Sequence, residues 1–329
     1  MTTGIPHQRT WQLLHLLADG EFHSGEMLAG QLGVSRATIF NALAEVNDYG
    51  VMLQRIRGRG YRLAQPWRPL RLDEITACLG ADANKFSVEI MLQATSTNSL
   101  LLQRATQGAP SGSVLAVELQ TAGRGRMGRT WYSGLGGALT FSLLWRFDCA
   151  LHALSGLSLA VGVAVVRALN KCDAQGVYLK WPNDILTEQG KLAGVLIEAQ
   201  GDMLGPSAVV IGIGLNCMLP GNFLGQIDQP IDALAEVCAQ PPARNQLLAS
   251  LLQELSSVLE QFEQEGFGAL RGDWELHHLY QDQQVQVRMG DGVAVHGVAR
   301  GVTDSGELCL ETLQGMRLLN SGEIGVLQR

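Results

Sequence analysis

Apolar residues recur at helical spacing in three short segments near the N-terminus, and Leu28 and Ile39 lie in the second and third of them. Ser24 and Ser35 precede these two segments, where a serine side chain can cap a helix by accepting a backbone N–H bond. Gly33 lies between the segments and allows a tight turn. The pattern predicts three helices, of which the second and third form a helix-turn-helix.

Residues 51–63 alternate between apolar and polar positions, carry glycines near their centre and contain four arginines. This pattern predicts a β-hairpin, and a hairpin beside a helix-turn-helix forms the wing of a winged domain, where it contacts phosphates. The third helix also carries side chains of the types that reach base edges. The residues expected to contact DNA are Ser35, Arg36, Thr38, Asn41, Arg57 and Arg59.

Beyond residue 70 the pattern changes to apolar strands that alternate with amphipathic helices. Strands are predicted at 114–119, 138–147, 177–181, 195–198 and 208–213, and helices at 97–107, 154–169 and 248–262. The run at 208–213 is almost wholly apolar, which indicates a central strand. From residue 282 onward, short apolar runs separated by glycine-containing turns predict a small β-barrel.

These patterns predict an α+β protein with three domains. We expect a winged helix-turn-helix at 1–65, a linker at 66–72, an α/β body at 73–280 and a C-terminal β-barrel at 281–329. The linker is indicated by Pro66 and Pro69, which flank Trp67.

Charge is distributed unevenly along the 329 residues, whose formal net charge is −7. Residues 1–68 hold seven Arg and no Lys against five acidic residues, or +2, which leaves 17 basic against 26 acidic residues, or −9, for the rest. A mildly basic head on an acidic body fits a DNA-binding module joined to another function. The hydrophobic content of 46% excludes a disordered chain.

The six cysteines are scattered and form no C-x-x-C pair, which argues against a zinc site or a disulfide framework. The chain begins with no basic-then-apolar signal segment, and its longest uncharged apolar stretch contains His152, Ser155 and Ser158. We therefore expect a cytoplasmic protein without a membrane partner and without a protein-bound metal site.

The most informative segment is 123–131, which lies between two predicted strands. It contains three Arg and three Gly and ends at Trp131. Glycine lets the backbone approach a ligand, and arginine supplies planar donors for carboxylate and phosphate groups. The chain has no G-x-x-x-x-G-K-[ST] loop and no complete dinucleotide-binding glycine pattern. An anionic ligand, such as a nucleotide, would therefore bind by another route.

Two further clusters carry polar side chains at the ends of predicted elements. Lys180-Trp181-Pro182-Asn183-Asp184 is followed closely by Lys191-Leu192-Ala193-Gly194, so two lysines lie at strand ends, where ligand contacts are common. Ser96-Thr97-Asn98 begins a predicted helix, where it serves as a cap and offers hydroxyl and amide groups to a polar ligand.

Taken together, these motifs resemble the bifunctional biotin protein ligases that also act as biotin operon repressors. The resemblance covers nearly the whole chain, with the winged head, the body and the β-barrel in the family's order. It rests on Ser96-Thr97-Asn98, on Gln120 ahead of the 123–131 segment, on the two lysine clusters, and on Gly212 to Asn216. It implies a class II synthetase-like α/β catalytic domain and a C-terminal barrel of the SH3 type.

The resemblance implies a reaction in two steps, with ATP, biotin and Mg²⁺ as cofactors and substrates. Biotin and ATP form biotinyl-5′-AMP, and a lysine of the biotin carboxyl carrier protein of acetyl-CoA carboxylase then takes the biotin. Two anions must meet in the first step, so fixed positive charge is needed in the site. Arg124, Arg126 and Lys191 are the candidates for that charge.

The resemblance also implies roles for individual residues. Arg126 and Lys191 are expected to be catalytic. The expected biotin-binding residues are Ser96, Thr97, Asn98, Gln120, Arg124, Gly125, Arg126 and Lys191. The expected ATP- or adenylate-binding residues are Arg124, Arg126, Arg129, Trp131, Asn183, Asn216 and Arg300. The loop at 218–229 is expected to close over the adenylate, and Asp184 is a candidate for a general base.

In the resembling family the adenylate is also a corepressor, so we expect an adenylate-bound homodimer that binds a two-fold operator. Three alternatives remain open. The body could sense an effector without ligase activity, the ligase could use lipoate, or the arginine-rich segment could simply bind nucleic acid. Lipoate has no ureido ring to pair with Ser96, Thr97 and Gln120, and the −9 body argues against the last alternative.

Overall fold

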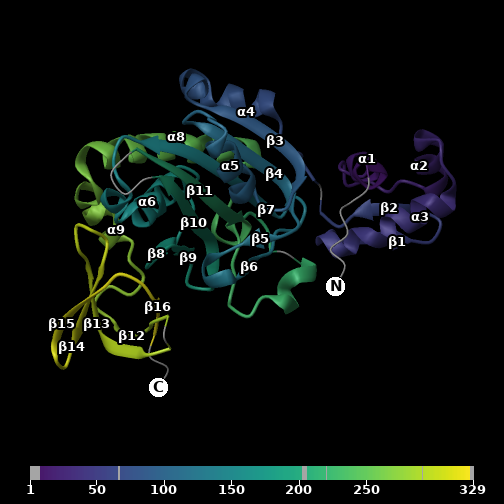
Figure 1. Ribbon diagram of the computed structural model, residues 1–329. Helices are drawn as coiled ribbons and strands as arrows, with labels where there is room; N and C mark the ends of the chain where they lie inside the picture. The colour runs from purple at the N-terminus through teal and green to yellow at the C-terminus, as the bar shows by residue number, and fades with distance from the viewer. Residues whose placement is uncertain (1–7, 66, 202–205, 220, 291, 327–329) are drawn as a thin grey trace.

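The computed structural model describes residues 8–65, 67–201, 206–219, 221–290 and 292–326. Figure 1 shows a small helical head, a central body built on one sheet, and a small β domain at the C-terminus. This arrangement confirms the predicted α+β class with its three parts in the expected order. None of the described helices is long and apolar enough to cross a membrane.

The head forms as its caps and turn predict. Helices α1 (Gln8–Leu16), α2 (Gly25–Leu32) and α3 (Arg36–Ala44) precede the hairpin of β1 (Leu53–Ile56) and β2 (Gly60–Leu63). The hydroxyls of Ser24 and Ser35 accept the backbone N–H of Met27 and Thr38, both at 3.1 Å. Gly33 takes the left-handed conformation, with φ of 63°, that ends α2.

The body is a seven-stranded mixed sheet in the order β3-β4-β7-β11-β10-β9-β8. Only the β3–β4 pair is parallel. The main strands are β3 (Ser87–Ala94), β4 (Ser113–Gln120), β7 (Ala138–Phe147), β8 (Tyr178–Lys180), β9 (Asp184–Leu186), β10 (Lys191–Gly201) and β11 (Ser207–Asn216). The short pair β5 (Gly123–Arg124) and β6 (Thr130–Trp131) lies apart from this sheet. The strand β3 was not predicted, because its half-exposed edge position gives it only a weak apolar pattern.

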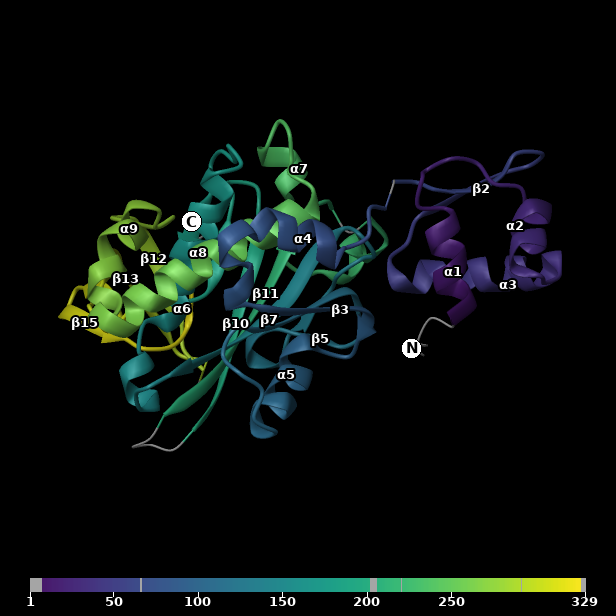
Figure 2. The same ribbon diagram turned by 90° about the horizontal axis from the view of Figure 1, so that it is seen from above.

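Helices cover the two faces of the sheet differently. Helices α4 (Leu72–Leu79), α6 (Leu157–Asn170) and α8 (Arg244–Glu265) pack together over one face, and α5 (Thr97–Thr106) packs on the other, as Figures 1 and 2 show. The shorter helices α7 (Leu234–Val237) and α9 (Arg271–Leu276) flank this layer. The second face is therefore only partly covered by helix.

The central strand β11 shows how the sequence leaves room on that second face. Its alternate residues Val209, Ile211, Ile213 and Leu215 join the main core. Ala208 and Val210 point the other way and pack with α5. Farther along that face the side chains give way to Gly212 and Gly214. A strand alternates its faces residue by residue, so these glycines form a shallow floor beyond α5.

The C-terminal domain is a five-stranded antiparallel sheet in the order β15-β14-β13-β12-β16. Its strands are β12 (Gln284–Arg288), β13 (Ala294–Val302), β14 (Leu308–Thr312), β15 (Gly315–Leu319) and β16 (Glu323–Val326). The segment that leads from α9 into this domain pairs with β8 of the body, where Leu179 N donates to His277 O at 2.7 Å. The neighbouring His278 stacks on Trp274, and burial lowers the pKa of His278 to about 4, so it is neutral near pH 7.

The segment between head and body is held firmly at one buried carboxylate. Glu118 of β4 accepts the indole N–H of Trp67 at 3.1 Å and lies 2.6 Å from the guanidinium of Arg244. It also accepts the backbone N–H of Leu70. Trp67 and Leu70 are thus packed against the body, while Pro66 of the predicted linker lies outside the described residues. The exact domain boundaries at 65, 72 and 280 stay predictions.

Replacing the buried cation at this junction is expected to destabilise the fold. The Arg244→Met variant leaves Glu118, whose side chain is 1% exposed, without its countercharge. We expect the free energy of unfolding to fall by about 3 kcal/mol, because one partner of a buried ion pair is left uncompensated. Urea unfolding of the full chain measures this change.

The matched control is Arg104→Met, which removes an ion pair with Glu89 whose side chains are 37% and 49% exposed. That change is expected to cost less than about 1 kcal/mol, because exposed pairs contribute little. Equal losses in the two variants would contradict the special position of Arg244.

Candidate active site

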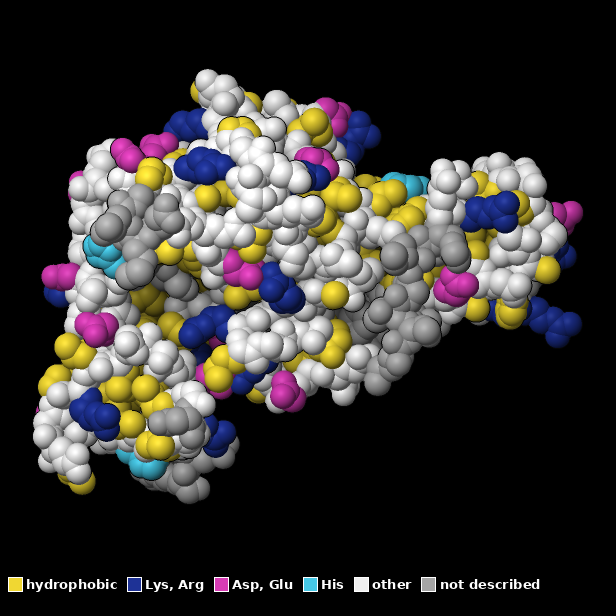
Figure 3. All heavy atoms as spheres, in the orientation of Figure 1, with side chains coloured by type: hydrophobic (Ala, Val, Ile, Leu, Met, Phe, Trp, Pro, Cys, Tyr) yellow, Lys and Arg dark blue, Asp and Glu magenta, His cyan; other side chains and the backbone are white. Residues whose placement is uncertain are grey.

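A cavity of about 350 Å³ lies over the glycine floor of the sheet. Its walls come from the N-terminus of α5, the end of β4, residues 124–132, the β8–β9 hairpin, and the strands β10 and β11. Residues 226–229 and Gly322–Glu323 of the C-terminal domain complete the rim. Lys and Arg side chains gather in dark blue at the hollow above the small β domain in Figure 3. The volume is in the range of small-molecule sites.

One end of the cavity is built from neutral hydrogen-bonding groups. Gln120 Oε1 accepts the backbone N–H of Thr97 at 2.8 Å and lies 3.2 Å from Thr97 Oγ1. Ser96 is the N-cap of α5, so its hydroxyl is turned toward the helix. Because Gln120 Oε1 already accepts from Thr97, the N–H₂ group of the amide is the part that remains available to donate to a ligand. This end of the cavity can therefore form hydrogen bonds with a small, uncharged polar group of a ligand.

Asn98 is held by the protein on both sides of its amide. Its Nδ2 donates to Leu196 O at 3.1 Å and to Glu198 Oε2 at 2.9 Å, and Ser142 Oγ lies 2.6 Å from Oδ1. A Cβ atom on Gly212 would lie 2.2 Å from Asn98 Oδ1, so this glycine is required for the approach. Asn98 lines the cavity but mainly fixes the start of α5 to β7 and β10. The sequence patterns assign no role to Ser142 or Glu198, because the partners of both side chains are distant along the chain.

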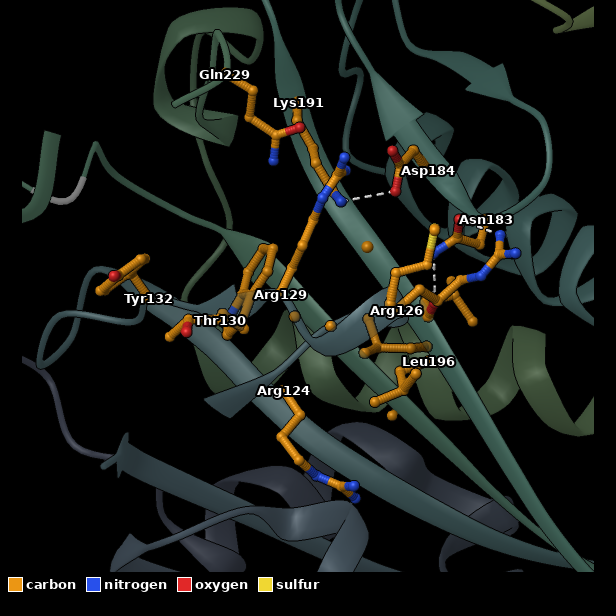
Figure 4. Close-up of a pocket in the computed structure, with 18 of the residues that line it drawn as sticks. Arg124, Arg126, Arg129, Thr130, Tyr132, Asn183, Asp184, Lys191, Leu196 and Gln229 are labelled. Atoms are coloured by element: carbon orange, nitrogen blue, oxygen red, sulfur yellow. Dashed lines mark hydrogen bonds and ion pairs between the residues drawn. The ribbon is translucent and has the colours of Figure 1, made fainter. Parts of the chain in front are cut away.

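The other end of the cavity is rich in positive charge. Lys191 Nζ lies 2.7 Å from Asp184 Oδ1, Arg126 Nη1 donates to Asn183 Oδ1 at 3.0 Å, and both interactions are drawn in Figure 4. Arg129, from the same segment as Arg126, lies 2.6 Å from Glu323. Burial lowers the pKa of the Arg126 guanidinium, yet arginine remains charged at any physiological pH.

Arg124 is directed away from this cationic end in Figure 4. It pairs with Glu198 at 2.6 Å, nearer the neutral end of the cavity. The arginines of segment 123–131 are therefore divided between the two ends and do not form one cluster.

Trp131 lines the cavity beside Lys191. Its ring packs against Gly214, where an added Cβ atom would lie 2.3 Å from Cε2. Lys191 Nζ lies 6.0 Å from the ring centroid. The indole N–H of Trp131 is buried against Gly214 and has no hydrogen-bond partner in the described part of the chain.

Two residues predicted to bind nucleotide are not among those that line the cavity. Asn216 is buried, and its Nδ2 donates to the carbonyls of Lys191 and Asp232, each at 3.1 Å. These bonds hold together the two ends of the loop that contributes residues 226–229 to the rim. Arg300 pairs with Asp282 and Glu311, both at 2.7 Å. The partners of Asn216 and of Arg300 are all at least 11 positions away along the chain, so a local motif does not reveal them.

The head presents its own candidate residues at the surface. Ser35, Arg36, Asn41, Arg57 and Arg59 are exposed, and Thr38 is half-buried. The wing is ordered by cation–π contacts, in which Arg59 lies 4.3 Å from the ring centroid of Phe22 and Arg55 lies 4.8 Å from that of Phe40. Ser35 already serves as a helix cap, so its hydroxyl is less free than the sequence suggests. The head therefore offers an exposed basic wing beside the helix that would enter the groove.

Known protein families match all three parts of the chain. The model of the biotin/lipoate A/B protein ligase family matches residues 90–216, that of the biotin protein ligase C-terminal domain matches 282–326, and that of a helix-turn-helix domain matches 9–62. These matches fall on the body, the small β domain and the head.

Curated relatives extend the similarity to nearly the full length. The bifunctional ligase/repressor BirA of Escherichia coli is 36% identical over 96% of both chains. The protein of the same name from Bacillus subtilis is 29% identical over 93% of this chain and 94% of its own. A biotin–[acetyl-CoA-carboxylase] ligase of Mycobacterium tuberculosis is 34% identical over 75% of this chain and 91% of its own.

A solved structure agrees with these relatives. The biotin protein ligase of Aquifex aeolicus, determined in complex with biotin and ATP, matches with a TM-score of 0.63 and 28% identity over 73% of this chain and 97% of its own. The chain therefore belongs to the biotin protein ligases, and within them to the bifunctional ligase/repressors that carry an N-terminal helix-turn-helix domain.

Proposed function

We propose that the chain joins biotin to ATP and then transfers biotin to a lysine of the biotin carboxyl carrier protein. The observation that carries this proposal is the division of one cavity into a neutral end at Thr97 and Gln120 and a cationic end at Arg126 and Lys191. Biotin has a ureido ring at one end and a carboxylate at the other, which matches this division. A lipoate ligase, the second candidate, would leave the neutral end without a polar partner.

In the first step a carboxylate oxygen of biotin attacks the α-phosphorus of ATP. The new oxygen–phosphorus bond forms as the bond to the leaving pyrophosphate breaks, which yields biotinyl-5′-AMP. Arg126 and Lys191 offset the repulsion between the carboxylate and the phosphate, because cationic donors are strong in a poorly solvated site. Asp184 and Asn183 hold these two side chains in position until the substrates arrive.

In the second step the amine of the acceptor lysine attacks the carbonyl carbon of the adenylate. The carbon–nitrogen bond forms, the bond to the AMP oxygen breaks, and the amine gives up a proton. Asp184 is a carboxylate of the cationic end that touches Lys191, and we assign it the task of holding that proton. AMP then leaves with the charge that Arg126 and Lys191 stabilise.

Residues at the two ends have separate binding roles in this proposal. Ser96, Thr97, Gln120 and the backbone of Arg124 and Gly125 hold the biotin ring, with Asn98 fixing the helix start beneath them. Arg129, Trp131 and Asn183 contact the nucleotide. Asn216 acts through the loop that it clamps. Arg300 would have to leave its ion pairs with Asp282 and Glu311 to make its predicted contact with the nucleotide.

We propose that Mg²⁺ accompanies ATP. The described residues contain no group of three or more His, Cys, Asp or Glu side chains able to hold a metal ion, so the phosphates themselves would supply most of its ligands. Its contribution would be to reduce the negative charge that approaches the carboxylate.

We also propose that the adenylate-bound chain dimerises and represses biotin biosynthesis genes through its head. The exposed Arg36, Asn41 and wing arginines provide base and phosphate contacts. Two heads held in one dimer gain effective concentration on a two-fold operator.

The direct test of the ligase proposal is labelling of a carrier-protein fragment by the purified chain with biotin, ATP and Mg²⁺. Mass spectrometry is expected to find one biotin on the acceptor lysine, and none when ATP is omitted. Biotin binding without any transfer would instead favour a repressor that senses biotin and has no ligase activity.

The Lys191→Ala variant is expected to slow adenylate formation by about 100-fold, because it removes a cation that acts on the charge of the transition state. Biotin affinity is expected to change much less, since the ring contacts at Thr97 and Gln120 remain. Single-turnover kinetics and calorimetry measure the two quantities. The control is Lys171→Ala, which removes a surface ion pair with Glu254. Equal losses in rate and affinity would exclude a transition-state role for Lys191.

Biotinyl-5′-AMP is expected to strengthen both self-association and binding to DNA upstream of the biotin biosynthesis genes, by about tenfold or more. Sedimentation and footprinting, with and without the adenylate, measure the two effects. The Arg57→Ala/Arg59→Ala variant is expected to weaken DNA binding and reduce its salt dependence, while adenylate-induced dimerisation persists. Operator affinity that does not respond to the adenylate would overturn the corepressor proposal.

A further inference from the structure

Lys180 is the cationic side chain of the cavity that the proposed reaction has not yet used. It ends β8 and faces Asp184 across the β8–β9 hairpin, where the two residues are register partners. Its side chain is half-buried and lines the cavity. Five cations line this cavity, and the other four are Arg124, Arg126, Arg129 and Lys191.

Lys180 differs from those four in its contacts. Arg124, Arg129 and Lys191 each pair with a carboxylate, and Arg126 donates to the amide of Asn183. Lys180 has no hydrogen-bond acceptor and no ion-pair partner within the described ranges. A half-buried ammonium loses part of its hydration without compensation, and burial accordingly lowers its pKa. An anion bound in the cavity would supply the missing partner.

The position of Lys180 indicates which anion this is. The charges that act on it are those of Asp184, Lys191, Glu323 and Arg129, which belong to the cationic end beside the C-terminal domain. Biotin enters from the opposite, neutral end in the proposed reaction. In phosphoryl and nucleotidyl transfer the attacking and leaving oxygens lie roughly in line, so the leaving group points away from the biotin ring.

We propose that Lys180 binds the pyrophosphate portion of ATP and stabilises it as the leaving group. As the bond between the α-phosphorus and the bridging oxygen breaks, that oxygen gains negative charge. The unpaired ammonium of Lys180 stabilises this charge by donating a hydrogen bond to the oxygen. Arg129 also binds the pyrophosphate portion once the β- and γ-phosphates displace Glu323 from its ion pair with Arg129. This inference rests on the proposed ATP-dependent reaction and assigns Lys180 to its first step alone.

Separate assays of adenylate formation and of biotin transfer distinguish this role of Lys180 from a general structural role. The Lys180→Met variant is expected to slow biotin-dependent exchange of pyrophosphate into ATP by about 100-fold and to raise the KM for pyrophosphate. Transfer of biotin from supplied biotinyl-5′-AMP to the carrier protein is expected to stay within about twofold, since pyrophosphate takes no part in it. Lys180→Arg is expected to restore part of the exchange rate, and Lys171→Met serves as the surface control.

Equal slowing of exchange and transfer would overturn the proposal, and so would an unchanged exchange rate. Calorimetric binding of inorganic pyrophosphate to the wild-type chain and to Lys180→Met tests the same contact without any turnover, with an expected loss of about tenfold in affinity. A wild-type chain that binds pyrophosphate but catalyses no exchange would refute the proposed reaction while leaving the Lys180 contact supported. Equal pyrophosphate affinity in both chains would refute the contact itself. Retained biotin binding by the variant establishes that its site is folded.

Discussion

The structure must hold five cationic side chains around one cavity before any anion has bound. At distances of a few ångströms such charges repel strongly where water is scarce. Partner groups from separate elements reduce this repulsion, with Glu198 from β10, Asp184 from β9 and Glu323 from β16 each holding one cation. In the proposed reaction the β- and γ-phosphates displace Glu323 from its pair with Arg129. The cavity therefore carries the positive charge that anionic ligands need, while the paired carboxylates stabilise it before those ligands bind.

The same geometry gives the head a physical route to the site. Glu118, which holds Trp67, lies two residues before Gln120 on β4. The chain that follows the arginine segment also meets the head, since added Cβ atoms on Gly134 and Gly136 would lie 3.2 Å from Gly50 O and 2.9 Å from Trp67 Cδ1. The chain segment that follows residues 124–132 therefore contacts the head at Gly134 and Gly136.

Local patterns were sufficient to predict most of the fold. Ser24, Gly33 and Ser35 specify the helix-turn-helix by capping and by a left-handed turn, and the apolar run at 208–213 identifies the central strand. The sequence also brought Gln120, Arg126 and Lys191 forward as site residues, and the structure places all three at one cavity. It could not identify Ser142, Glu198 or Glu323, because their importance depends on partners 44 to 194 positions away. The two carboxylate partners of Arg300, Asp282 and Glu311, are likewise visible only in the folded chain, and its contact with the nucleotide stays a prediction.

A crystal structure of the chain with biotin and a non-hydrolysable ATP analogue would show how the two substrates lie in the cavity. We expect the ureido ring at Thr97 and Gln120, the carboxylate and α-phosphate between Arg126 and Lys191, and the terminal phosphates toward Lys180. Biotin bound with its ring at the cationic end, or a nucleotide held outside the cavity, would contradict the division of the site on which the account depends.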